Sequence, residues 1–74
     1  MTKPTHNIYL RKHEGQKTRN LYIGAGWAHG KGDGLNIAVN RPGDVVLEAM
    51  RAGFVELVAF EASGDQPEQT GPIA

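Results

Sequence analysis

The chain has 74 residues, a formal net charge of zero and no cysteine. A chain of this length can form one small domain of marginal stability, because it buries only about 60% of its unfolded surface. The lack of cysteine excludes disulfides and thiolate metal sites and fits a reducing compartment. We therefore expect stabilisation by a partner chain, most simply a homo-oligomer. No apolar run approaches the roughly 20 residues of a membrane span, and residues 1–6 do not resemble a signal peptide, so we expect a soluble, cytoplasmic protein.

Residues 1–6 are expected to be disordered, and the first strand is predicted over residues 7–14, where Ile8 and Leu10 alternate with polar or aromatic residues. A turn at residues 15–18 leads into a second strand over residues 19–28. The apolar residues of that strand are expected to share one face: Leu21, Ile23, Ala25 and Trp27. Gly24 and Gly26 then lie on the opposite face, which indicates a curved sheet, close approach of another backbone, or a flat docking seat.

A glycine-rich turn at residues 30–34 returns the chain into a third strand over residues 35–39. Asp44 as N-cap and Gly53 after the last turn predict a helix over residues 44–52. A strand over residues 44–48 is the alternative, because that segment contains three consecutive apolar residues, Val45, Val46 and Leu47. A last strand over residues 54–62 carries apolar residues on both faces, so we place it centrally in the sheet.

These elements predict a single α+β domain over residues 7–62, a small antiparallel sheet with one short helix in the order β-β-β-α-β. Residues 63–74 have the composition of a disordered tail. The predicted core draws on all five elements: Ile8, Leu10, Leu21, Ile23, Trp27, Leu35, Ile37, Val39, Val46, Met50, Val55, Leu57 and Phe60.

The sequence offers little catalytic or cofactor chemistry. The glycine-rich segment lacks the spacing of a nucleotide-binding loop, because Ala25 and Gly32 stand where such a loop needs glycine and serine or threonine. The three histidines are irregularly spaced and predict no metal site. Glu56 stands out on an apolar strand, and we expect it at a rim or paired with Arg51. We therefore expect no enzyme activity, no catalytic residues and no cofactor.

Surface recognition is the remaining class of function. Residues 1–41 carry seven Lys or Arg and two acids, a net charge of +5, whereas residues 42–74 carry a net charge of −5. This asymmetry predicts either an acidic partner for the first half or mutual neutralisation within the fold. Aromatic and basic residues are interleaved on the first strands, as in platforms for single-stranded nucleic acid. The candidate binding residues are Tyr9, Arg11, Arg19, Tyr22, His29 and Lys31.

Residues 23–37 resemble a group of small uncharacterised proteobacterial proteins, many of them found on plasmids, phages and other mobile elements. The group shares a pattern like I-G-x-A-[WF]-x-H-x-x-G-x-G-[FL]-N-[IL], onto which Trp27, His29, Gly34 and Asn36 fall. Ala28 replaces the usual proline and Gly26 the usual alanine. The resemblance implies a small accessory protein that binds and blocks or modulates a larger host machine, including defence systems such as CRISPR complexes.

The leading hypothesis is thus a non-enzymatic accessory protein that binds a larger protein or nucleoprotein complex. The alternative is a small nucleic-acid-binding module that uses the same basic, aromatic-bearing sheet surface.

Overall fold

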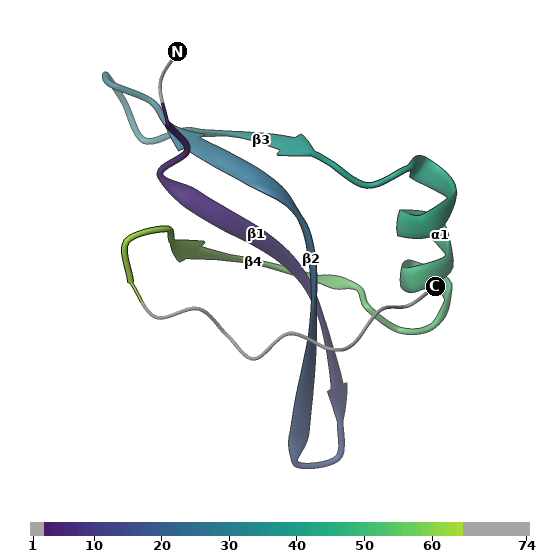
Figure 1. Cartoon of the computed structure of the whole chain (residues 1–74). Helices are drawn as coiled ribbons and strands as arrows, with labels where there is room; N and C mark the ends of the chain where they lie inside the picture. Colours follow the sequence, from purple (N-terminus) through teal and green to yellow (C-terminus); the bar gives the residue numbers. More distant parts are fainter. Residues whose placement is uncertain (1–2, 65–74) are drawn as a thin grey trace.

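The computed structural model describes residues 3–64, which form a four-stranded antiparallel sheet and one helix (Figure 1). The elements follow the predicted order β-β-β-α-β: β1 (His6–Glu14), β2 (Lys17–Ala28), β3 (Leu35–Val39), α1 (Gly43–Arg51) and β4 (Glu56–Glu61). The strand order across the sheet is β3-β2-β1-β4. The predicted α+β class is confirmed, and no helix among residues 3–64 is long and apolar enough to span a membrane.

Strand β1 begins at His6, and the segment before it is already paired. The Thr5 N–H donates to the Gly26 carbonyl at 2.9 Å, and the Thr5 carbonyl accepts from the Ala62 N–H at 2.9 Å. Thr5 is therefore hydrogen-bonded to the sheet and His6 belongs to it, although the sequence predicts a disordered start over residues 1–6. Residues 1–2 lie outside the described residues. At the other end of the domain, residues 63–64 are described as a turn and bend, and the rest of the predicted tail lies outside the described residues.

The β1–β2 hairpin is the longest part of the sheet. Its two-residue turn places Gly15 at φ 62°, a conformation that glycine adopts without steric cost. Strand β4 pairs with β1 only as far as Arg11, and β3 pairs with β2 only from Gly24 onward. The closed end of the hairpin therefore projects beyond both edge strands (Figure 1).

A β-bulge in β2 reverses the predicted assignment of its faces. Ile8 pairs with Gly24 and Tyr9 pairs with Tyr22, so Ile23 is an extra residue without its own partner on β1. Leu21 and Ile23 both enter the core. After the bulge, Gly24 shares the face of Ile8, whereas Ala25 and Trp27 turn to the opposite face. The expectation that these four apolar residues share one face is therefore wrong, because strict alternation cannot reveal a bulge.

Close packing explains both strand glycines. A Cβ on Gly24 would collide with the backbone carbonyl of Ala38 in β3. A Cβ on Gly26 would lie 3.2 Å from the Ile8 side chain and 3.4 Å from that of Leu35. Close approach of another backbone is confirmed for Gly24, whereas the neighbours of Gly26 are side chains. A bare docking seat is excluded, because neighbouring groups already occupy the space.

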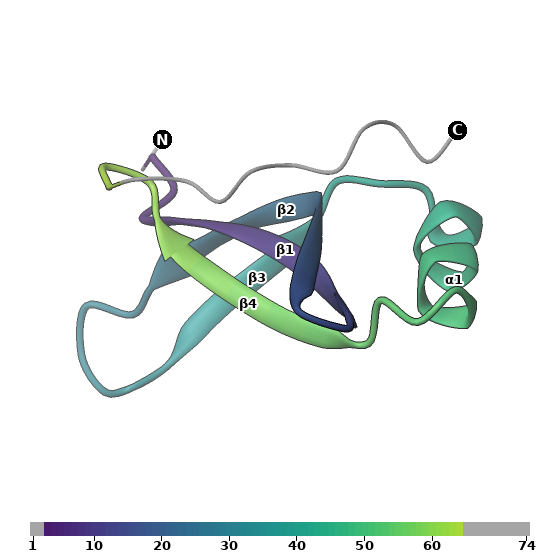
Figure 2. The ribbon, with the colours of Figure 1, turned by 90° about the horizontal axis from the view of Figure 1, so that it is seen from below.

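Helix α1 lies at one end of the sheet, between the end of β3 and the start of β4 (Figures 1 and 2). It spans Gly43–Arg51, and Gly53 follows its C-cap at φ 107°, as the sequence predicts. The strand alternative over residues 44–48 is wrong. Asp44 is also not the N-cap, because Pro42 occupies that position. Asp44 lies in the first turn, where its negative charge interacts favourably with the positive end of the helix dipole.

The core lies between α1 and the sheet face that we call the helix-side face. It combines sheet residues with the end of the helix and the segment after it: Ile8, Leu10, Leu21, Ile23, Ala49 and Phe54, with Leu35 and Val46 partly buried beside them. Six large hydrophobic residues are exposed, five of them predicted as core: Ile37, Val39, Leu47, Met50, Val55 and Leu57. Strand β4 is an edge strand rather than a central one, so its apolar residues on this face are only partly covered.

Candidate binding surface

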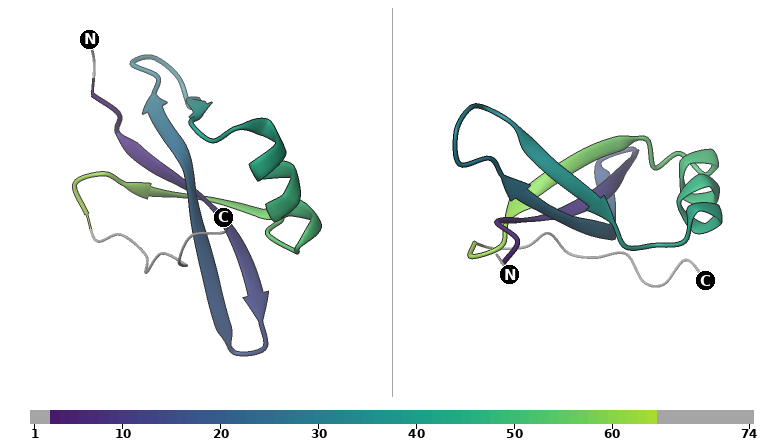
Figure 3. Two further views of the ribbon diagram at one scale, coloured as in Figure 1. Left: turned by 45° about the vertical axis from the view of Figure 1, so that its right-hand side comes forward. Right: turned by 90° about the horizontal axis from the view of Figure 1, so that it is seen from above.

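The sheet face opposite α1 carries a cluster of aromatic and polar side chains. We call it the tyrosine–arginine face and define it by five residues: Tyr9, Arg11, Asn20, Tyr22 and Phe60. Directly paired residues project on the same side of a sheet, and the register pairs Tyr9 with Tyr22 and Arg11 with Asn20. Three strands, β1, β2 and β4, therefore contribute to one surface (Figure 3 shows these strands from two further directions).

Tyr9 is the centre of the aromatic cluster. Its ring lies edge-on to Tyr22 at a centroid distance of 5.7 Å and edge-on to Phe60 at 5.8 Å. Only 5% of Tyr9 is exposed. Burial, and then the neighbouring Tyr22 phenol, raise the pKa of Tyr9 above its ordinary value. The prediction that Tyr9 is a surface contact is therefore corrected: Tyr9 supports Tyr22 and Phe60, which are half-buried and retain exposed ring surface.

Only one of the three guanidinium nitrogens of Arg11, Nε, is hydrogen-bonded among residues 3–64. Its Nε–H donates to Asn20 Oδ1 at 2.9 Å, and the guanidinium carbon lies 5.7 Å from the centre of the Phe60 ring. Asn20 is itself 3% exposed, so its amide is a fixed acceptor. Among residues 3–64, the two terminal nitrogens of Arg11 have no acceptor. An arginine fixed in this way presents a planar fork suited to a carboxylate or a phosphate.

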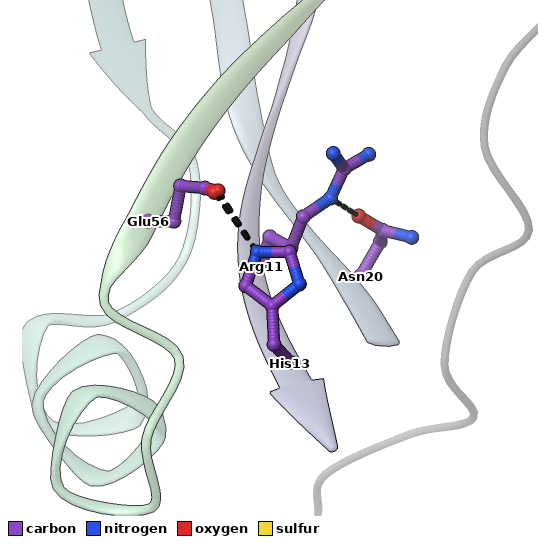
Figure 4. A network of polar contacts seen from close by, with 4 residues as sticks. All are labelled: Arg11, His13, Asn20 and Glu56. Atoms are coloured by element: carbon purple, nitrogen blue, oxygen red, sulfur yellow. Dashed lines mark hydrogen bonds and ion pairs between the residues drawn. The ribbon is translucent and has the colours of Figure 1, made fainter. Parts of the chain in front are cut away.

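Glu56 is the carboxylate that stands opposite Arg11 in the β1–β4 register, yet it does not pair with Arg11. Its two oxygens each lie 3.1 Å from His13 Nε2 (Figure 4). A carboxylate only accepts hydrogen bonds, so Nε2 carries the proton. The expected pairing of Glu56 with Arg51 is wrong, since Arg51 instead contacts Glu48 at 3.2 Å within the helix.

Tyr22 is fixed from the side of β3. Its hydroxyl accepts a hydrogen bond from Asn40 Nδ2 at 3.2 Å, and its backbone carbonyl accepts from Arg41 Nε at 3.0 Å. Arg41 thus adds a second guanidinium group beside the tyrosine–arginine face. Sequence reasoning missed two members of this face, Asn20 and Phe60, and two residues that contact Tyr22 beside it, Asn40 and Arg41. Only the pairing register and the bulge bring them to Tyr9, Arg11 and Tyr22.

The other three predicted binding residues lie elsewhere. Arg19 faces the helix side of the projecting hairpin end, where it pairs with Glu14 at 3.2 Å. His29 Nε2 donates to Asn36 Oδ1 at 3.0 Å at the opposite end of the sheet. Lys31 is exposed in the adjoining loop. Thus the structure brings together three of the six predicted residues and separates the rest.

Metal chemistry finds no support in the described chain. Across residues 3–64, no group of three or more His, Asp or Glu residues is placed to hold an ion. The His29 ring is hydrogen-bonded to Asn36 and lies over Gly34, so a Cβ on Gly34 would require the ring to move. Comparison with protein-family models, with curated proteins and with solved structures finds no match to this chain.

Proposed function

We propose that this chain is a small non-enzymatic binding protein whose tyrosine–arginine face attaches to acidic groups of a larger protein or nucleoprotein complex. The observation that carries the proposal is the partly satisfied Arg11. Its Nε–H is fixed by Asn20 while its terminal nitrogens have no acceptor among residues 3–64. A pre-oriented guanidinium loses little side-chain entropy when it binds a carboxylate or a phosphate.

The chemistry around Arg11 fits a protein interface. Arginine and tyrosine are enriched among the residues that dominate binding energies, especially where neighbouring groups exclude water. Phe60 and Tyr22 supply apolar surface beside the Arg11 guanidinium, and Tyr9 packs edge-on against both rings. A mobile-element accessory protein that blocks or modulates a host machine would use a surface of this kind.

A nucleic-acid module is the second candidate, and the half-exposed rings of Tyr22 and Phe60 favour it. Bases stack on such rings while phosphates meet arginine. Burial of Tyr9 removes one of the expected stacking rings, and the zero formal charge of the chain lowers the electrostatic attraction to phosphates. We therefore place it second.

Capture from a bacterial lysate, with and without nuclease and at two salt concentrations, separates the two candidates. A discrete protein that survives nuclease supports the leading proposal. Recovery of nucleic acid alone, lost as salt rises, contradicts it and supports the module, because phosphate contacts weaken steeply with salt. Capture of neither class by the wild-type chain counts against both.

Two matched variants test the face itself. Arg11→Gln removes the fork and keeps a polar side chain of similar length. Arg51→Gln removes the same charge from an exposed helix position whose contact is with Glu48 in the same helix. We expect Arg11→Gln to weaken capture by about tenfold or more, as for a central arginine of an interface, and Arg51→Gln to leave it within about twofold. Equal effects would show that only net charge matters.

A further inference from the structure

Strand β3 forms an outer edge of the sheet with unused hydrogen-bonding groups. The Asn40 N–H donates to the Ile23 carbonyl at 2.6 Å, and the Gly34 carbonyl accepts from the His29 N–H at 3.0 Å. In an antiparallel ladder, alternate residues direct both backbone groups toward the same neighbour. Even-numbered residues of β3 thus face β2, and the N–H and C=O groups of Leu35, Ile37 and Val39 point outward. No residue in the described part of the chain pairs with those groups.

The side chains of the same three residues form an apolar row. Ile37 pairs with Gly26 and Val39 pairs with Gly24, which places the row on the helix-side face. Ile37 is 41% exposed and Val39 54%. The strand contains no charge, no proline and no bulge. Those are among the devices that keep an edge strand from pairing with another chain, so β3 lacks this protection.

The opposite edge of the sheet is protected by charge. Strand β4 begins at Glu56 and ends at Glu61. Charged residues on an edge strand are one of the devices that disfavour pairing with another chain. The two edges therefore differ, because β4 carries a carboxylate at each end, whereas β3 carries no charge.

We propose that β3 pairs antiparallel with β3 of a second copy of this chain, about a two-fold axis at Ile37. This register sets Ile37 opposite Ile37, and Leu35 opposite Val39, so all outward backbone groups of the three residues find partners in six hydrogen bonds. The six side chains of Leu35, Ile37 and Val39 from the two copies then form one continuous apolar row.

Charge supports the same register and the same partner. Asp33 and Arg41 lie four residues before and four residues after Ile37. Continuing the antiparallel register past the strand ends brings Asp33 of one copy toward Arg41 of the other at both ends of the junction; Arg41 Nε is bound to the Tyr22 carbonyl of its own chain, so its terminal nitrogens are the groups that would meet Asp33. The chain also has zero formal net charge, so two copies do not repel each other overall.

The proposed dimer has one eight-stranded sheet. A two-fold axis through an antiparallel junction is perpendicular to the sheet, so the two tyrosine–arginine faces lie on the same side. A dimer would present two copies of that face to one partner and raise the effective affinity by avidity. The argument for self-association uses β3 and its flanking residues, and it does not depend on the proposed function.

Sedimentation equilibrium of the purified full chain is the first test. We expect the wild-type chain to sediment with the mass of two chains and the Ile37→Lys variant with the mass of one chain. Val55→Lys is the matched control, since it adds the same charge at a residue that is 71% exposed and outside β3; it should remain dimeric. A monomeric wild-type chain at submillimolar concentration, or a dimeric Ile37→Lys variant, would overturn the proposal.

Cysteine substitution tests the register and does not depend on how lysine is tolerated. The chain has no cysteine, so a single introduced thiol gives an unambiguous product. At the two-fold axis, opposing Cα atoms lie about 5.5 Å apart, within the range of a disulfide. Ile37→Cys should therefore cross-link on mild oxidation. Val39→Cys should not, because its two copies lie about 14 Å apart along the strands. Cross-linking of Val39→Cys but not Ile37→Cys would overturn the register.

Discussion

Gly24→Ala is the substitution for which the structure predicts the largest backbone conflict. The added methyl carbon would collide with the carbonyl oxygen of Ala38 and lie 3.0 Å from the carbonyl carbon and 3.1 Å from the Val39 Cα. These atoms belong to the backbone of β3, so no side-chain rotation can relieve the overlap. Strand β3 would have to move away from β2 and lengthen their shared hydrogen bonds.

The expected cost is about 3 kcal/mol, at the upper end of the range for overpacking. In a domain of this size, 1 kcal/mol shifts Tm by about 4–8 °C, so Tm should fall by about 12–24 °C. Gly30→Ala is the control, because a Cβ at Gly30 meets nothing within 4 Å, and it should change stability by no more than about 0.5 kcal/mol. Thermal unfolding followed by circular dichroism measures both. A Gly24→Ala variant that melts within a few degrees of Gly30→Ala would refute the close approach of β3 to β2.

Three further predictions concern the core and the tyrosine–arginine face. Ile8 is fully buried, so Ile8→Ala should cost about 2–5 kcal/mol in urea unfolding, whereas Val55→Ala, at a residue 71% exposed, should cost about 0.5 kcal/mol or less; similar costs would contradict the assigned core. Asn20→Ala should cost about 1 kcal/mol, because Arg11 Nε loses its buried acceptor, and an unchanged urea midpoint would show that this bond contributes nothing. The raised pKa of Tyr9 means that the unfolded chain releases this proton first, so stability should fall as pH rises above about 10. Tyr9→Phe should show a smaller alkaline loss than the wild type, and an identical pH profile would contradict the burial of that hydroxyl.

Local signals in the sequence were sufficient for the order and type of the elements. Gly53 after a run of good helix formers marked the end of α1, and alternation marked β1 and β3. The place of β4 was not predictable in the same way. Its apolar residues on both faces resemble those of a buried central strand, but the topology leaves it with β1 as its only neighbour. Edge position depends on pairing, which periodicity does not specify.

The candidate surface was predicted only in part for a similar reason. Tyr9, Arg11 and Tyr22 could be placed together from alternation within the strands. Their fixed geometry depends on Asn20 and Phe60, which come from other strands and reach Tyr9 and Arg11 through the register. The bulge at Ile23 then shifts β2 by one residue, which an alternating pattern of Leu, Ile, Ala and Trp does not reveal.

The most direct test of the tyrosine–arginine face follows the Nε–H signals of the arginine side chains by NMR as the captured partner is added to the isotope-labelled chain. Arg11 Nε–H is held by Asn20 beside the terminal nitrogens that are expected to bind, whereas Arg51 lies on the helix. We predict that the Arg11 signal shifts or broadens in proportion to bound partner while the Arg51 signal stays unchanged. An unperturbed Arg11 signal in a saturated complex, with changes confined to α1, would contradict the proposed binding surface.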